Sequence, residues 1–219
     1  MELSIGPPGV PTIHRAILRT TRCGLDEEAS VSPDVRTVDS AAYARRLGAS
    51  FLPGEVVALD ESDESLLLAS SIGTVRDLTV LTTGLDVAQL LWDRVDVRVV
   101  LISGVIDRQT RSVVAAGPGS FALGRQISRG FFGGSSYSPA SGLLERYPGL
   151  AHTKKLLADQ CITCHGHIFA SKVDHFALYT SVTFDRIAEL SVINGEAPVP
   201  TGTEPVDPPT AAPKLLLQG

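Results

Sequence analysis

The sequence predicts an α/β fold in which a mainly parallel, twisted sheet is flanked by helices. Short apolar runs alternate with helical patterns along the middle of the chain, and this order is typical of βαβ units with parallel strands. The composition agrees with a packed interior, because 43% of the 219 residues are hydrophobic. One domain with less regular ends is the simplest organisation for a chain of this length.

The first regular segment begins at Asp39 or Ser40, whose short polar side chains can cap a helix that continues to Phe51. Pro53 and Gly54 end that helix, and the apolar run that follows suits a buried parallel strand. The alternation then repeats. We expect strands at 55–59, 78–82 and 97–102, and helices at 64–72 and 85–92.

The second half of the chain continues the same pattern with more glycine. Pro148 is well placed for the first turn of a helix. We expect strands at 112–116, from 130, at 167–170 and at 191–193, and helices near 120–127 and at 150–161. In this arrangement the strand-associated residues Leu59, Leu81, Ile102, Phe132 and Phe169 are buried.

The two ends of the chain differ from the middle. Residues 1–35 mix proline, glycine and charge without sustained periodicity, so a loosely held arm is expected there. Residues 36–197 form the expected domain. Residues 198–219 are rich in proline and poor in large apolar side chains, which predicts a disordered tail.

Charge and hydropathy limit the classes of function. The formal net charge is −5 and the sequence pI is near 5.5, which disfavours DNA binding by phosphate neutralisation. The N-terminus has neither a basic segment nor an apolar segment typical of a signal peptide, and no stretch has eighteen consecutive apolar residues. We therefore expect a cytoplasmic protein that does not contact a membrane.

Cys161, Cys164 and His165 form the spacing that attaches c-type haem, and His167 nearby raises the alternative of a metal site. Haem attachment occurs outside the cytoplasm, where this chain is not expected. A third cysteine, Cys23, is too distant in sequence to suggest a disulfide framework. Buried, reduced structural thiols are the preferred interpretation, with no cofactor and no metal.

Five sequence motifs occur in an order that is characteristic of one family. They are Leu52–Asp60, Leu78–Ala88, Val99–Gly104, Ser128–Gly133 and Thr153–Lys155. On these motifs, the run 36–194 resembles the effector-sensing domain of DeoR-family bacterial transcriptional regulators. The resemblance implies a fold shared in outline with ribose-5-phosphate isomerase and coenzyme A transferases.

The resemblance also implies a function. The chain would bind a sugar or sugar phosphate where parallel strands end, as a homo-oligomer, and would contact DNA only through a winged helix that this sequence does not contain. The anionic end of the ligand would lie nearer Lys154 than the acidic loop that follows Asp60. The implied ligand-binding residues are Asp60, Ser62, Asp63, Thr83, Gly104, Gly133 and Lys154.

The sequence departs from the family where the phosphate is held. A Gly-Thr-Thr loop is replaced by Ser62, Asp63 and Glu64, and two carboxylates repel a phosphate. One alternative is therefore a domain that no longer binds a ligand and serves in oligomerisation or interaction. An isomerase-like enzyme is a weaker alternative, because the sequence identifies no nucleophile paired with a base, and we expect no catalytic activity.

Overall fold

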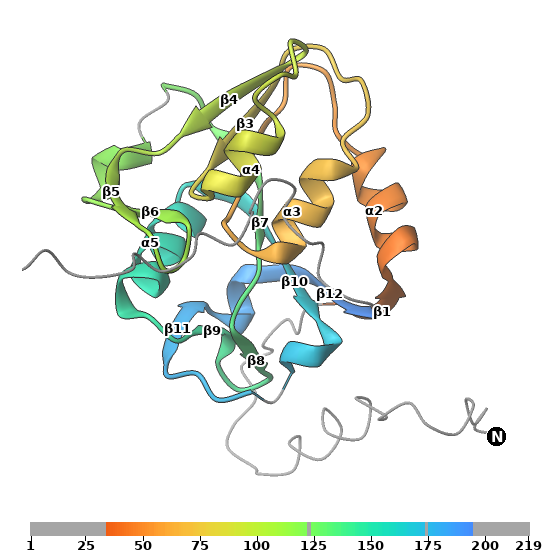
Figure 1. Cartoon of the computed structure of the whole chain (residues 1–219). Helices are drawn as coiled ribbons and strands as arrows, with labels where there is room; N and C mark the ends of the chain where they lie inside the picture. The colour runs from red at the N-terminus through yellow and green to blue at the C-terminus, as the bar shows by residue number, and fades with distance from the viewer. Residues whose placement is uncertain (1–33, 122–123, 174, 195–219) are drawn as a thin grey trace, which may run out of the picture.

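The computed structural model describes residues 34–121, 124–173 and 175–194. Its centre is a seven-stranded sheet in which every pair of neighbouring strands is parallel (Figure 1). Along the sheet the strands are β1 (Asp34–Asp39), β12 (Ile187–Asn194), β10 (Cys161–Phe169), β7 (Ile127–Phe132), β2 (Val56–Leu59), β3 (Leu78–Thr82) and β4 (Val97–Leu101). The predicted parallel α/β architecture is confirmed.

The strands bury both faces, as expected for a sheet covered on both sides. On β2, Val56 and Ala58 belong to one apolar cluster, whereas Val57 and Leu59 belong to the other. The helices α2 (Ser40–Gly48), α3 (Asp63–Ser70) and α4 (Leu85–Leu90) cover the face of Val57 and Leu59. The helix α5 (Pro148–Ala158) packs on the opposite face (Figure 1).

The five residues expected in or beside strands are buried, with exposed fractions between 0% and 4%. The cap of α2 also follows the prediction, because the Asp39 side chain accepts a hydrogen bond from the Ala42 amide at 2.8 Å. The described chain begins at Asp34 with strand β1, which starts inside the segment expected to be an arm. The remainder of that arm and the tail from 198 lie outside the described residues.

Two antiparallel sheets extend the parallel core, and neither was predicted in full. One is the hairpin of β5 (Gly104–Asp107) and β6 (Ser112–Ala115). The other contains β8 (Ser136–Ser138), β9 (Gly142–Glu145) and β11 (Tyr179–Val182). These strands are three or four residues long, which is too short to show a period of two in the sequence.

The helix predicted at 120–127 is wrong. The structure has a single 3-10 turn, η1 (Pro118–Phe121), and β7 already begins at Ile127. Strand β7 pairs with both β2 and β10, so sheet hydrogen bonding determines its start more than local propensity does. Gly130 lies within it because a Cβ atom there would come 2.6 Å from the Cys161 sulfur.

The predicted helix to Cys161 is also too long. Helix α5 ends at Ala158, and the chain continues as β10, which starts six residues earlier than the strand expected at 167–170. Cys161 pairs with Ile127 of β7, so both cysteines lie on a strand and not at a helix end. Cys161 and Cys164 are buried free thiols, as expected.

Candidate ligand-binding site

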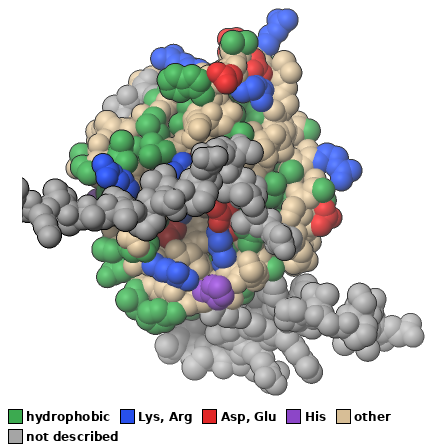
Figure 2. Space-filling model, viewed as in Figure 1, with side chains coloured by type: hydrophobic (Ala, Val, Ile, Leu, Met, Phe, Trp, Pro, Cys, Tyr) green, Lys and Arg blue, Asp and Glu red, His purple; other side chains and the backbone are tan. Residues whose placement is uncertain are grey.

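A cavity of about 260 Å³ lies beside the carboxyl end of β2. The turn between β2 and α3, the junction of β9 and α5, and the segment after β10 supply its walls. Figure 2 shows charged side chains of both signs gathered around a hollow in this face. The lining residues are Glu61, Ser62, Asp63, Thr110, Gly134, Ser135, Glu145, Arg146, Tyr147, Leu150, Lys154, Lys172 and His175.

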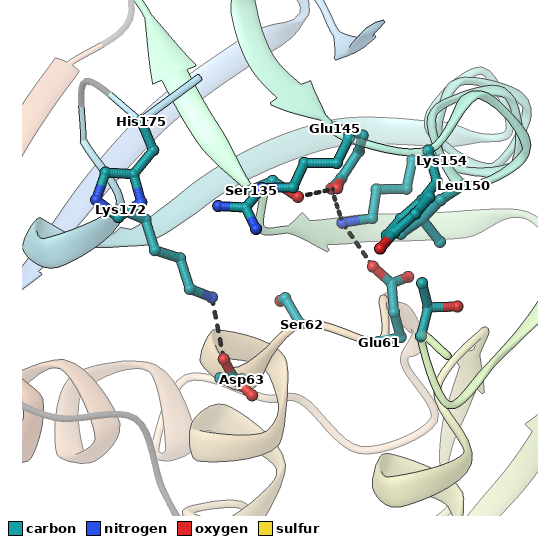
Figure 3. Close-up of a pocket in the computed structure, with 13 residues that line it drawn as sticks. Glu61, Ser62, Asp63, Ser135, Glu145, Leu150, Lys154, Lys172 and His175 are labelled. Carbon is teal, nitrogen blue, oxygen red and sulfur yellow. Dashed lines mark hydrogen bonds and ion pairs between the residues drawn. The ribbon is translucent and has the colours of Figure 1, made fainter. Parts of the chain in front are cut away.

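Lys154 is the buried cation of this cavity, with a side chain only 1% exposed. Its Nζ lies 2.5 Å from Glu145 Oε1, 2.7 Å from Glu61 Oε1 and 2.9 Å from Asp60 Oδ2. It also donates a hydrogen bond of 3.0 Å to the Gly133 carbonyl oxygen. One ammonium is therefore shared by three carboxylates, and Figure 3 shows its contacts with Glu61 and Glu145.

The three carboxylates and the lysine shift one another's pKa. Burial lowers the pKa of Lys154, but the charges of Asp60, Glu145 and Glu61 outweigh it and raise the pKa well above its ordinary value. Burial would raise the pKa of Asp60, yet the Lys154 charge and hydrogen bonds hold it well below its usual range. Burial, opposed by Lys154, raises the pKa of Glu61 to about 7. Glu61 therefore exchanges a proton near neutral pH.

Asp60 is fixed by a set of short polar contacts at the end of β2. Its Oδ1 accepts hydrogen bonds from the hydroxyls of Ser62 at 2.5 Å and Ser65 at 2.6 Å. Its Oδ2 accepts from the Gly133 amide at 2.7 Å. Gly133 must be glycine, because a Cβ atom there would lie 2.4 Å from the Ser62 hydroxyl oxygen. The Asp60 carboxylate is thus an internal structural anion.

His167 completes this buried network from β10. Its Nδ1 is hydrogen-bonded to the Tyr43 hydroxyl, and its Nε2 lies 3.1 Å from Ser65 Oγ. The hydroxyl hydrogens of Ser62 and Ser65 are both directed to Asp60, so His167 Nε2 must carry the hydrogen that it shares with Ser65. In that tautomer His167 has no free lone pair for Ser62, and the network holds no activated serine nucleophile.

Lys172 provides a second cation on another wall of the cavity. Its Nζ lies 3.1 Å from Asp63 Oδ2 and 3.0 Å from Glu64 Oε2, and its side chain is 24% exposed. Glu64 is fully buried and accepts a further hydrogen bond of 2.7 Å from the Phe169 amide. The two carboxylates that were expected to repel a phosphate are therefore both paired with Lys172.

The structure places the predicted ligand-binding residues in three groups. Ser62, Asp63 and Lys154 line the cavity. Asp60, Thr83 and Gly133 do not line the cavity but contact residues that do. Asp60 and Gly133 contact Lys154, and the Thr83 hydroxyl donates a hydrogen bond of 2.9 Å to Glu61 Oε2. Gly104 belongs to neither group, because it pairs with Ala115 in the β5–β6 hairpin.

Sequence reasoning missed part of the lining. Glu145 is the last residue of β9 and Arg146 follows it, and β9 is one of the short strands that carried no recognisable pattern. From the sequence, His167 was considered only in connection with a metal site, since its partners Tyr43 and Ser65 lie more than one hundred residues away in sequence. The available signal was an acidic and a basic residue side by side shortly before the helix expected at 150–161. Only the tertiary fold brings Glu145 into contact with Lys154.

A family model described as the DeoR C terminal sensor domain matches residues 41–192. The search of curated proteins found no significant match.

Several solved structures are similar at low sequence identity. A D-ribose-5-phosphate isomerase in complex with phospho-erythronic acid is 11% identical with a TM-score of 0.45, over 61% of this chain and 52% of that chain. Ribose 5-phosphate isomerase A from Methanocaldococcus jannaschii is 11% identical with a TM-score of 0.43, over 61% and 53%. The decarboxylase AibA/AibB is 10% identical with a TM-score of 0.47, over 80% and 88%. This chain spans about half the length of the isomerase chains, and these similarities concern the fold alone.

Proposed function

The chain belongs to the DeoR C-terminal sensor domain family, and from that premise we propose that it senses a sugar or sugar phosphate bound in the cavity beside Lys154. It would act as the effector-binding part of a transcriptional regulator that contacts DNA through a separate winged-helix domain. Within the described residues, no helix is both long and apolar enough to span a membrane.

The observation that carries the proposal is the chemistry of the cavity walls. The lining of the cavity of about 260 Å³ includes two acidic residues, Glu61 and Glu145, and three residues with hydroxyl groups, Ser62, Ser135 and Thr110. Carboxylates accept hydrogen bonds from sugar hydroxyls, whereas serine and threonine hydroxyls both donate and accept. Ser135 already donates to Glu145 at 2.7 Å, so this wall is ordered before a ligand arrives.

The charges favour one orientation for an anionic ligand. Around Lys154, three carboxylates face one ammonium, which leaves an excess of two formal negative charges, or one when Glu61 is protonated. A phosphate at Lys154 would therefore be repelled. Arg146 and Lys172 also line the cavity, and their two positive charges balance the carboxylates of Asp63 and Glu64, so this side has no formal excess of negative charge. Figure 3 shows Lys172 and His175 away from Lys154. The phosphate of a sugar phosphate belongs on their side, opposite to the orientation expected from the sequence.

Ligand binding can be coupled to a change of conformation because the walls of the cavity come from separate parts of the chain. Ser62 precedes α3, Arg146 precedes α5 and Lys172 follows β10. A ligand that contacts all three favours the arrangement in which they are close together, and thereby shifts the population of conformations. This linkage is the physical basis proposed for sensing.

Calorimetric titration with ribose, ribose 5-phosphate and a panel of hexoses and their phosphates tests the proposal. We expect binding of at least one phosphorylated sugar, and a loss of about tenfold in its affinity for Arg146→Gln. Binding of the matching unphosphorylated sugar should change little. Arg108→Gln, at an exposed position that does not line the cavity, is the matched control.

The outcome also separates the alternatives. Absence of binding, and of any rise in melting temperature, across the panel would favour an interaction domain that no longer binds an effector. Turnover of aldose and ketose phosphates would instead support an isomerase-like enzyme. Binding that is lost in Arg108→Gln but retained in Arg146→Gln would place the ligand elsewhere.

A further inference from the structure

The two edges of the parallel sheet differ in how they are protected. Edge strand β1 carries charged residues at Asp34, Arg36 and Asp39, which discourage pairing with another chain. Edge strand β4 is Val97–Leu101, and its only charged residue is Arg98. A β-branched edge strand with one charge and no proline is a template for strand addition. Figure 1 shows β4 at the margin of the sheet.

The backbone of β4 has hydrogen-bonding groups directed outward. The Ile102 amide donates to the Thr82 carbonyl of β3 at 3.1 Å, so the amide of Ile102 points into the sheet. Because successive residues of a strand alternate in direction, the N–H and C=O groups of Val99 and Leu101 point away from β3. Among the described residues, no strand pairs with this side of β4.

Exposed apolar side chains lie near both ends of β4. Before its amino end, Trp92 is 82% exposed and Val95 is fully exposed. At and after its carboxyl end, Leu101 is 40%, Val105 72% and Ile106 59% exposed. An antiparallel pair of identical strands brings the amino end of one against the carboxyl end of the other. With a two-fold axis at β4, the apolar side chains near the amino end of one strand would therefore be covered by those near the carboxyl end of the other copy's strand.

We propose that a second copy of this chain pairs with β4 in antiparallel orientation across a two-fold axis at Val99. The two seven-stranded sheets then form one continuous sheet through an isologous interface. In this register Val97 lies opposite Leu101 of the partner subunit, and Arg98 lies opposite Val100 of the partner subunit. An axis at Arg98 would instead place two arginines face to face, which is destabilising.

A cysteine at the axis tests both the interface and its register. In a Cys23→Ser background, Val99→Cys should form an intermolecular disulfide under mild oxidation, because directly paired residues have Cα atoms about 5.5 Å apart. Arg98→Cys is the matched control. Its two copies would be offset by two residues along the strands, beyond disulfide reach, so little cross-linking is expected.

Analytical ultracentrifugation supplies a test that does not depend on oxidation. The unmodified chain should sediment as a dimer, and Leu101→Glu combined with Val105→Glu should sediment as a folded monomer, since both side chains are already exposed. Thr37→Glu, at the exposed β1 edge, should remain dimeric. A monomeric unmodified chain, a dimeric double variant, or cross-linking through position 98 in place of 99 would overturn the proposal.

Discussion

Lys154 and Lys172 line the same cavity and both contact carboxylates, but their surroundings differ. Lys154 is 1% exposed and shared by Asp60, Glu61 and Glu145, whereas Lys172 is 24% exposed and paired with Asp63 and Glu64. A buried cation that neutralises several buried anions is a structural requirement, because removing it leaves uncompensated charges. A more exposed cation retains access to solvent and to a ligand. We propose from this comparison that Lys154 has a structural role and that the anionic group of a ligand contacts the side of the cavity that holds Lys172.

The largest expected effect is that of Lys154→Met. The variant keeps the length of the side chain but leaves three buried carboxylates without their ammonium, so the free energy of unfolding should fall by about 3–5 kcal/mol. Urea denaturation followed by circular dichroism measures the change. Lys155→Met, at the exposed neighbouring position, should change the stability by less than about 0.5 kcal/mol. Equal effects of the two substitutions would contradict the structural role of Lys154.

The next expected effect is a dependence of stability on pH that arises from Glu61, which contacts Lys154. The pKa of Glu61 is raised from 4.5 to about 7, so the folded protein binds a proton that the unfolded chain has already released between those pH values. The stability contributed by this proton is present at low pH and is lost as the pH rises through that window, by roughly 3 kcal/mol at most.

Glu61→Gln removes this titration. The stability of the variant relative to the unmodified protein should therefore increase from pH 5 to about pH 7 and remain constant above it. Denaturation at a series of pH values checks the trend, with Asp93→Asn at an exposed turn as the control. A difference that is independent of pH would show that Glu61 is ionised throughout.

The smallest expected effect on stability is that of Lys172→Met. Asp63 is 45% exposed and can be solvated by water, and Glu64 keeps its hydrogen bond from the Phe169 amide. The expected loss is about 1–2 kcal/mol, below that for Lys154→Met. Lys172→Arg should restore most of it in the same denaturation assay. If Lys172→Met proves more destabilising than Lys154→Met, the contrast between the two lysines is reversed.

The sequence predicted the strands β2, β3 and β4 of the parallel sheet because each is a mainly apolar run rich in β-branched residues. Strand β1, which is mostly polar, was not predicted. The run that became β3 and the β-branched run of β4 were identified within one residue of their observed limits. The antiparallel sheets were predicted only in part: β6 was expected at 112–116, whereas β5, β8, β9 and β11 are three or four residues long and have no detectable period. The start of β10 was missed because pairing with β7 extends the strand into Cys161, where local propensity alone favoured a helix.

The sequence predicted where the cavity lies better than it predicted which charged groups contact one another there. Parallel strands present their carboxyl ends at one edge of a sheet, and this rule led to the region in which Ser62 and Lys154 line a cavity. Ligand binding in that cavity stays a prediction. The sequence could not show that Glu145 lies 2.5 Å from Lys154, because that contact depends on the turn between β9 and α5. Because the sequence did not reveal this contact, Lys154 was predicted to be available to bind the phosphate of a ligand.

The most direct test of the different roles of the two sides is a crystal structure with the sugar phosphate that calorimetry selects. We predict a ligand in the cavity with its phosphate within hydrogen-bond distance of Arg146 or Lys172, while Lys154 keeps its contacts with Asp60, Glu61 and Glu145. A phosphate bound to Lys154 Nζ, or a ligand bound outside the cavity, would contradict the account.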